Sequence, residues 1–293
     1  GGTLDGASYA LNSGSVNSVL GGSGAITKST TGTVSLGGAN TGYTGNVTIN
    51  AGTLSLANAA ALSGANAVTV GTANAARLQL GANTTLGSLN GGTASLVGLD
   101  LGSSGLTISG TGVSAFDGVI AGAGSLTNSG TGTVTLSGSN TYTGGTTVNA
   151  GSLIVAAGGS LAASGAVTVA SSGSATFQNV NATVGAVSNS GTALFSGAGT
   201  ATLASLSGVG TTTFNNDATI SGSLSGGTVS VGGVAAIGTL SGGSLTLSNS
   251  GTNSTVTTLN GGTVAVSGTL TVNDGTSSGV ISGAGSLVKA GAG

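Results

Sequence analysis

The sequence lacks cysteine, proline, methionine, tryptophan, histidine and glutamate. Without cysteine there can be no disulfide and no thiolate metal site. Without histidine, cysteine or glutamate, a catalytic triad or a carboxylate pair would need several of the few aspartates to converge. We therefore expect no catalytic site, no cofactor and no metal. The absence of proline suits stacked strands, because proline removes a ladder hydrogen bond.

Charge is almost as scarce, with three Lys or Arg and five Asp in 293 residues. Three cations cannot neutralise a run of phosphates, so we expect no nucleic-acid partner. They also argue against electrostatic binding to anionic lipid. No apolar run approaches a membrane span, so we expect membrane contact only through an anchor domain that this sequence does not contain.

Glycine and small polar residues fill the space that charge leaves. There are 61 glycines, 38 % of the residues are hydrophobic and mean hydropathy is +0.46. This is too apolar and too weakly charged for a disordered chain. Collagen is excluded by the absence of proline and of a strict glycine triplet. The chain therefore has enough Val, Leu and Ile to bury, beneath a surface of Ser, Thr, Asn, Gly and Ala.

A long repeat organises the chain. The stretch VLGGSGAITKSTTGTVSLGGANTGYTGNVTINAGTLSL starts at Val19, and VIAGAGSLTNSGTGTVTLSGSNTYTGGTTVNAGSLIV starts at Val119. The offset is 100 residues up to Asn40 and Asn140, and it shortens by one from Tyr43 and Tyr142 onwards. A third copy, VISGAGSLVKAGAG, begins at Val280. We predict a single continuous solenoid over residues 1–293, with repeats at about 17–70, 116–169 and 274–293.

A shorter period predicts the fold. LSGGTVSV, LSGGSLTL and LNGGTVAV follow one another at short steps from Leu224, Leu240 and Leu259. Each copy joins a glycine corner to a short alternating run whose first and third side chains share one face. This pattern predicts an all-β parallel β-helix, or β-solenoid, with rungs of about 16–19 residues. About 16 rungs would make a rod of roughly 75 Å. The best helix candidate is one turn at Ala57–Leu62.

The repeat also resembles a known family. GTVTLSGSNTYTGGTTVNAGSL and GTVSLGGANTGYTGNVTINAGTLSL are similar to the passenger-associated repeat of bacterial autotransporters. The resemblance implies a right-handed β-helical passenger, secreted to the outer cell surface, that serves as a stalk, spacer or fibre shaft in export and display. Its partners would be neighbouring repeats. Two alternatives are a filament subunit whose copies join end to end, and an adhesin that binds a host surface or glycan through its Ser/Thr/Asn face.

A few residues could form binding sites. Tyr43 and Tyr142 share one repeat position and could stack against sugars at the surface, although an aromatic that fills a rung, with its hydroxyl in water, is the favoured interpretation. Lys28 and Lys289 fall at equivalent repeat positions and are expected to be solvated charges. The five aspartates, Asp5, Asp100, Asp117, Asp217 and Asp274, are expected at turns rather than around calcium.

Ice binding is disfavoured by the threonine pattern in the sequence. Thr30–Thr31, Thr146–Thr147 and Thr211–Thr213 do not recur as a regular Thr-x-Thr on every rung. A flat, ordered hydroxyl surface is therefore not expected from the sequence.

Overall fold

The computed structural model describes residues 2–72, 75–93, 95–249, 253–276 and 278–291. These residues form parallel strands stacked as a β-solenoid of about 15 turns, which confirms the all-β solenoid prediction. Within the described ranges no segment is helical, so no helix there could cross a bilayer. Ser277 and residues 292–293 of the predicted third repeat lie outside the described residues.

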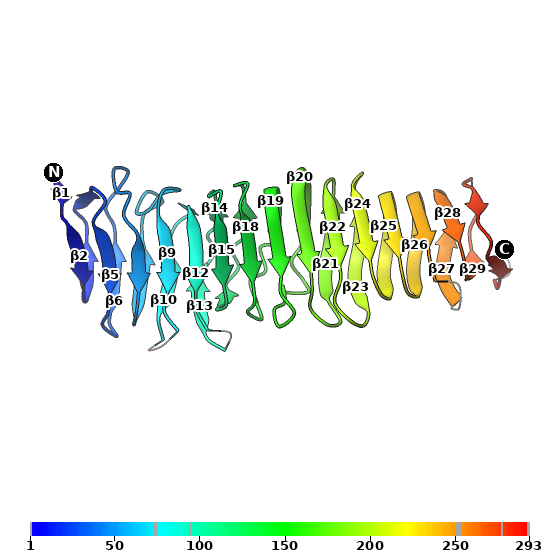
Figure 1. The fold of residues 1–293 in the computed structure, drawn as a ribbon, viewed down its shortest axis with the longest axis horizontal. Helices are drawn as coiled ribbons and strands as arrows, with labels where there is room; N and C mark the ends of the chain where they lie inside the picture. The colour runs from blue at the N-terminus through cyan, green and yellow to red at the C-terminus, as the bar shows by residue number, and fades with distance from the viewer. Residues whose placement is uncertain (1, 73–74, 94, 250–252, 277, 292–293) are drawn as a thin grey trace. The chain divides into compact units, whose positions relative to one another are not determined.

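The chain divides into two compact units. Unit 1 comprises Gly1–Ile154 and Gly158–Ala162, and unit 2 comprises Val155–Ala157 and Ala163–Gly293. In each unit the strands of successive coils lie side by side in chain order (Figure 1).

Unit 1 has three faces, each a ladder of parallel strands. Its first face contains β3 (Gly14–Val16), β6 (Thr33–Leu36), β8 (Thr53–Leu56), β10 (Arg77–Leu80), β13 (Val97–Asp100) and β16 (Val119–Ala121). Its second face contains β2 (Ser8–Leu11), β5 (Ala25–Lys28), β7 (Val47–Ile49), β9 (Ala67–Val70), β12 (Ser88–Gly91), β15 (Val113–Phe116) and β18 (Thr133–Leu136). Its third face contains β11 (Thr84–Leu86), β14 (Leu106–Ile108), β17 (Leu126–Asn128) and the start of β19 (Thr146–Val155). A separate pair joins β1 (Thr3–Asp5) to β4 (Val19–Gly21).

Unit 2 uses longer strands that continue around the corners of a coil. Its strands are β20 (Val167–Phe177), β21 (Thr183–Asn189), β22 (Thr192–Phe195), β23 (Ala201–Ser207), β24 (Thr211–Phe214), β25 (Ala218–Val231), β26 (Ala235–Leu247), β27 (Asn253–Leu259), β28 (Thr263–Val266), β29 (Thr269–Asp274), β30 (Ile281–Ser282) and β31 (Ser286–Lys289). Because β25 and β26 have 14 and 13 residues, a single strand here supplies most of a coil.

Alternation sets the core, as the sequence predicts. The inward pairs include Val134 with Leu136, Leu245 with Leu247, Val264 with Val266 and Leu270 with Val272, and all eight side chains are buried. Each buried aliphatic side chain contributes about 1.5–3 kcal/mol. The core therefore runs as columns of aliphatic side chains inside each unit.

Glycine makes the corners. Gly52 and Gly151 occupy the same repeat position, and each has φ +64°. This left-handed conformation costs a residue with a Cβ atom about 1–2 kcal/mol, but it costs glycine almost nothing. A Cβ at Gly151 would also lie 2.7 Å from the carbonyl oxygen of Gly130 in the preceding coil. Backbones of neighbouring coils can approach at this corner only because the side chain is absent.

The coil length differs between the units. In unit 1, Ile26 pairs with Val47 and Val47 pairs with Val68, so each of these coils is longer than the longest rung that the sequence predicts. In unit 2, Leu224 pairs with Leu240, which is the shortest predicted rung. The predicted rung length is therefore too short for most of unit 1, although the first coil, in which Ser8 pairs with Ala25, falls within it. The short period rests mainly on the LSGG and LNGG copies of unit 2, whereas unit 1 has one such copy, LNGGTASL at Leu89.

The Ala57–Leu62 segment is a hydrogen-bonded turn rather than a helix. The Oδ1 atom of Asn58 accepts from the Ala60 N–H at 2.8 Å, and Asn58 O accepts from Ala61 N–H at 3.0 Å. Asparagine competes for backbone donors in this way, which favours a turn over a helix.

Candidate functional site

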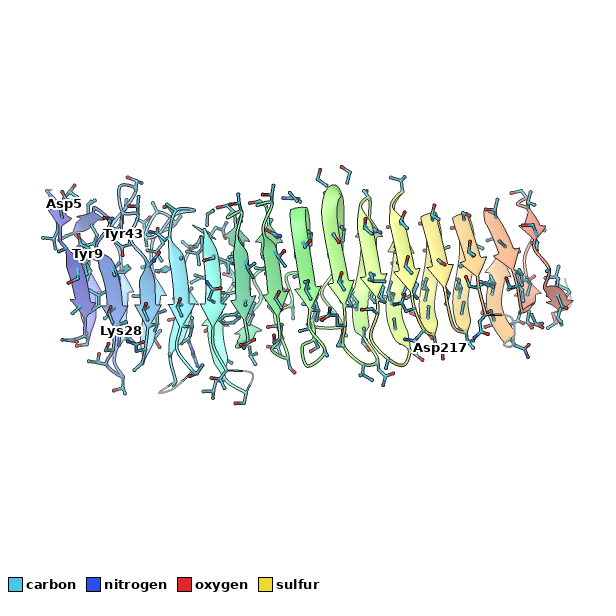
Figure 2. The ribbon with its side chains drawn as sticks, in the orientation of Figure 1. Asp5, Tyr9, Lys28, Tyr43 and Asp217 are labelled. Carbon is cyan, nitrogen blue, oxygen red and sulfur yellow. The ribbon has the colours of Figure 1, made fainter. Side chains whose placement is uncertain are left out.

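The tyrosine of the first repeat lies in the core. Tyr43 is 0 % exposed, and its ring meets Tyr9 edge-on with centroids 6.0 Å apart (Figure 2). Its hydroxyl accepts from Ile26 N–H and donates to Asn46 O, both at 3.1 Å. Burial raises the pKa of Tyr43 to about 12, and the Ile26 N–H opposes that rise. This side chain fills a coil and ties its corner to the adjacent strand.

The tyrosine of the second repeat is buried with a different partner. Tyr142 is 2 % exposed, and its hydroxyl lies 2.6 Å from the Thr146 hydroxyl. Burial raises its pKa well above the usual range. Thr146 replaces Val47 of the first repeat, so a core valine has become a core threonine that satisfies the tyrosine. Both rings fill a rung, but neither hydroxyl is in water, and neither ring presents a face on which a sugar could stack.

A repeated asparagine bridges three successive coils. Asn40 Oδ1 accepts from Leu20 N–H at 2.7 Å, and its Nδ2 donates to Ala61 O at 3.0 Å. Asn140 Oδ1 accepts from Ile120 N–H at 2.9 Å, and its Nδ2 donates to Ser160 O at 3.0 Å. Both side chains are almost fully buried, at 0 % and 3 % exposed. Their role is not predicted by the sequence, in which the only signal is the Asn-Thr pair that both repeats carry shortly before the tyrosine.

Lys28 is also buried, which corrects the expectation of a solvated charge. It is 0 % exposed, and its Nζ donates to Ala51 O and Thr30 Oγ1, both at 3.1 Å, and to Thr30 O. Loss of solvation lowers the pKa of this ammonium group. Three oxygen acceptors at a corner make burial of the charge tolerable.

The residues equivalent to Lys28 in the other two repeats, Asn128 and Lys289, also donate hydrogen bonds to backbone oxygens. Asn128, which is 3 % exposed, donates from Nδ2 to Gly132 O at 3.2 Å and to Ser152 O at 3.1 Å. Lys289 is exposed and donates to Asn273 O at 2.9 Å and Gly291 O at 2.8 Å. In each copy, therefore, a lysine or asparagine side chain at this repeat position bonds both to its own corner and to a neighbouring coil. We call Lys28, Asn40, Asn128 and Asn140 the bridging polar residues.

The two repeats do not sit on the same sides of unit 1. Strand β5 lies on the second face, whereas its repeat counterpart β17 lies on the third. Likewise β6 lies on the first face, and its counterpart β18 lies on the second. The second copy is therefore rotated by one face relative to the first.

Asp100 and Asp274 bond within their own turns, whereas Asp217 bonds to the coil that follows. Asp100 Oδ1 accepts from Gly102 N–H at 2.9 Å, Asp217 Oδ1 from Val234 N–H at 2.8 Å and Asp274 Oδ1 from Gly275 N–H at 2.7 Å. Among the described residues no group of three His, Cys, Asp or Glu lies close enough to hold a metal ion. The cavity beside Asp217 has a volume of about 10 Å³, which is room for about one water molecule.

The repeat corner is thus a structural device in both copies. It combines a buried tyrosine, a bridging asparagine and a side-chain donor at the Lys28 position, and in both copies the asparagine and this donor bond to adjacent coils. Chemically, the arrangement can hold one coil against the next.

Comparison with known proteins agrees with this geometry. A family model, the passenger-associated-transport-repeat, matches residues 26–56 and 126–155. These stretches contain most of β5 and all of β6–β8 and β17–β19, and the four bridging polar residues lie within them. The searches of curated proteins and of solved structures gave no match. The chain is therefore a parallel β-solenoid that carries passenger-associated transport repeats, consistent with an autotransporter passenger repeat protein.

Proposed function

We propose that this chain is a non-catalytic structural segment of a secreted bacterial surface protein, a spacer within an autotransporter-type passenger. The observation that carries the proposal is the coincidence of the two matched repeats with corners whose polar groups are satisfied by adjacent coils. A match to a transport repeat favours a role in export and display at the cell surface.

The mechanism is mechanical and thermodynamic. A coil cannot satisfy its polar corner alone, because Lys28 needs Ala51 O and Asn40 needs Ala61 O from the coil that follows. Each coil that docks adds a backbone ladder, buried aliphatic side chains and these bridges. Folding one coil upon the next outside the membrane would oppose sliding of the chain back inward.

Surface display tests the export role. The chain would be secreted as a fusion to an outer-membrane anchor, with both matched repeats deleted, residues 26–56 and 126–155. We expect that a smaller fraction of the repeat-deleted fusion than of the intact fusion will be accessible to external protease. The matched control removes one coil outside the repeats, from Ser196 to Phe214, and should retain display. Equal display by the repeat-deleted and intact fusions would overturn the proposed role.

Electron microscopy of the purified chain across a dilution series tests the spacer role. A spacer should give separate particles at every concentration. Filaments of constant width that lengthen with concentration would instead favour a subunit whose copies join end to end.

A further inference from the structure

Unit 2 carries two parallel columns of hydroxyl side chains on one face. The pairings of β20, β22, β24, β25, β26 and β28 align twelve outward positions in register. The first column is Ser174, Thr192, Thr211, Thr228, Ser244 and Thr263; the second is Thr176, Leu194, Thr213, Ser230, Thr246 and Ala265. Ten of the twelve positions carry a hydroxyl. We call this surface the hydroxyl face.

The residues of the hydroxyl face are not evenly spaced in the sequence, because coil lengths vary. Along the first column, the step from Thr228 to Ser244 is shorter in sequence than the step from Thr192 to Thr211. Serine also replaces threonine at several places. Of these strands only β24, with Thr211 and Thr213, carries Thr-x-Thr, so that motif indeed does not recur on every rung. The expectation that no ordered hydroxyl surface forms is wrong for unit 2, because strand register aligns serine with threonine from coil to coil.

The spacing of the face is regular in two directions. Successive rungs lie about 4.8 Å apart, and two outward residues of one strand lie about 6.7 Å apart. Beneath the face, the rings of Phe177, Phe195 and Phe214 are stacked with centroids 4.5 and 4.7 Å apart and interplanar angles of 6° and 12°. This stack packs successive rungs closely and holds them nearly parallel.

The hydroxyls are free to bind solvent. None of the ten forms a side-chain hydrogen bond within the described part of the protein, whereas the inward Thr212 Oγ1 accepts from Asn189 Nδ2 at 2.9 Å. Thr192, Thr211, Thr228 and Thr263 are exposed, and the second column is half-buried. The twelve positions carry no charge. By contrast, the first face of unit 1 includes Arg77 and Asp100.

We propose that the hydroxyl face binds ice. A crystal plane of water repeats in two directions, and the oxygen repeats of hexagonal ice lie close to both spacings of this face. Threonine is stiff at χ1, so its hydroxyl and methyl groups hold fixed positions. Rows of hydroxyls can then join the water lattice while the methyl groups fill the gaps between rows. This activity goes beyond the structural role and does not depend on it.

Ice growth tests the proposal directly. A single ice crystal is cooled in a solution of the full chain while its shape and its melting and freezing temperatures are recorded. We expect faceted crystals and a gap between the two temperatures. Round crystals that grow as soon as they are cooled below the melting point would overturn the proposal.

A matched pair of variants locates the activity. Thr213→Arg places a bulky charge at the centre of the face and should abolish faceting. Gln79→Arg is the control: Gln79 is half-buried like Thr213, but it lies on the first face of unit 1, in a column with Ser55 and Asp100. Loss in both variants, or in neither, would show that the hydroxyl face is not responsible.

A variant that increases ice binding would exclude misfolding as the cause of the loss in Thr213→Arg. Leu194→Thr replaces one of the two gaps in the second column with a hydroxyl, and a folding defect cannot increase ice binding. We expect a larger gap between melting and freezing temperatures than in the unaltered chain. An unchanged or smaller gap would contradict the proposed geometry.

Discussion

At the scale of residues, this protein depends on polar groups that it buries without water. The repeat corners bury tyrosine, asparagine and lysine side chains. Backbone groups of adjacent coils satisfy the asparagines and Lys28, and the nearby Thr146 hydroxyl satisfies Tyr142. An unsatisfied group of this kind costs about 1–3 kcal/mol, more than one ordinary hydrogen bond contributes. Each corner is therefore specified by pairs of residues.

Tyr142 and Thr146 should show coupled energetics. Tyr142→Phe leaves the Thr146 hydroxyl buried without its partner, and Thr146→Val does the same to the tyrosine, so each change should cost about 1–3 kcal/mol. The double variant removes both polar groups and should cost less than the sum of the two. Urea unfolding of the four proteins measures this. Additive costs would mean that the two hydroxyls do not depend on each other.

Alkaline pH should destabilise the first repeat through Tyr43. The pKa of this tyrosine is about 12 in the fold, against about 10 in an unfolded chain. Between these values the unfolded chain loses the proton first, so stability falls as pH rises from about 10 to about 12.

Lys28 acts in the opposite direction, at and below the lower end of that range. Its pKa is lowered in the fold, so its burial penalty fades as pH rises toward the unfolded value near 10.5. Tyr43→Phe isolates the tyrosine: its urea midpoint should fall less between pH 10 and 12 than that of the unaltered chain. Identical pH profiles would contradict the assignment to Tyr43.

At the scale of elements, each coil is a set of short strands joined by tight corners. The strands are too short to be stable alone, and the parallel ladders to the coils before and after supply their hydrogen bonds. The corners decide how closely coils approach, and glycine is required only where the backbone is left-handed or touches the next coil.

Gly151→Ala should destabilise the protein, whereas Gly112→Ala should have little effect. Gly151 has φ +64°, and a Cβ there meets the Gly130 carbonyl oxygen, so we expect a loss of at least about 1–2 kcal/mol. Nothing lies within 4 Å of a Cβ at Gly112, and its φ is not in the left-handed region. Thermal unfolding compares the two variants. Equal melting temperatures would show that corner geometry does not limit coil stacking.

At the scale of the whole chain, stability is close to a sum of contributions from neighbouring coils. Every described strand pairing is parallel and joins neighbouring coils. No single element is a nucleus on which all the others depend, so the number of coils can change without changing the fold.

Removing a whole coil should be milder than removing one residue. Phe195 pairs with Phe214, so excising the segment from Ser196 to Phe214 leaves strands that can pair in the same register. Deleting Thr212 alone shifts the alternation of β24 and would turn the Phe214 side chain outward. Circular dichroism and protease resistance should show a native-like fold in the first variant and a loosened one in the second. The reverse order would refute register as the controlling factor.

The sequence predicted what depends on local pattern and missed what depends on register. The inward pairs, such as Leu245 with Leu247, follow from alternation alone and are confirmed. Lys28 was expected in water because a lone lysine usually is; its buried acceptor Ala51 O lies in another coil. The columns of the hydroxyl face were missed for the same reason, since coils of unequal length place distant residues side by side.

The one-face rotation between the two repeats has an evolutionary consequence. The long repeat does not correspond to a whole number of coils of unit 1, yet both copies are paired throughout. A duplicated stretch of gene can therefore enter such a protein without matching the coil, provided that it matches the strand. The unit that duplication copies is then a strand with its corner. Repeated duplication would place copies of one ancestral motif on different faces of the solenoid.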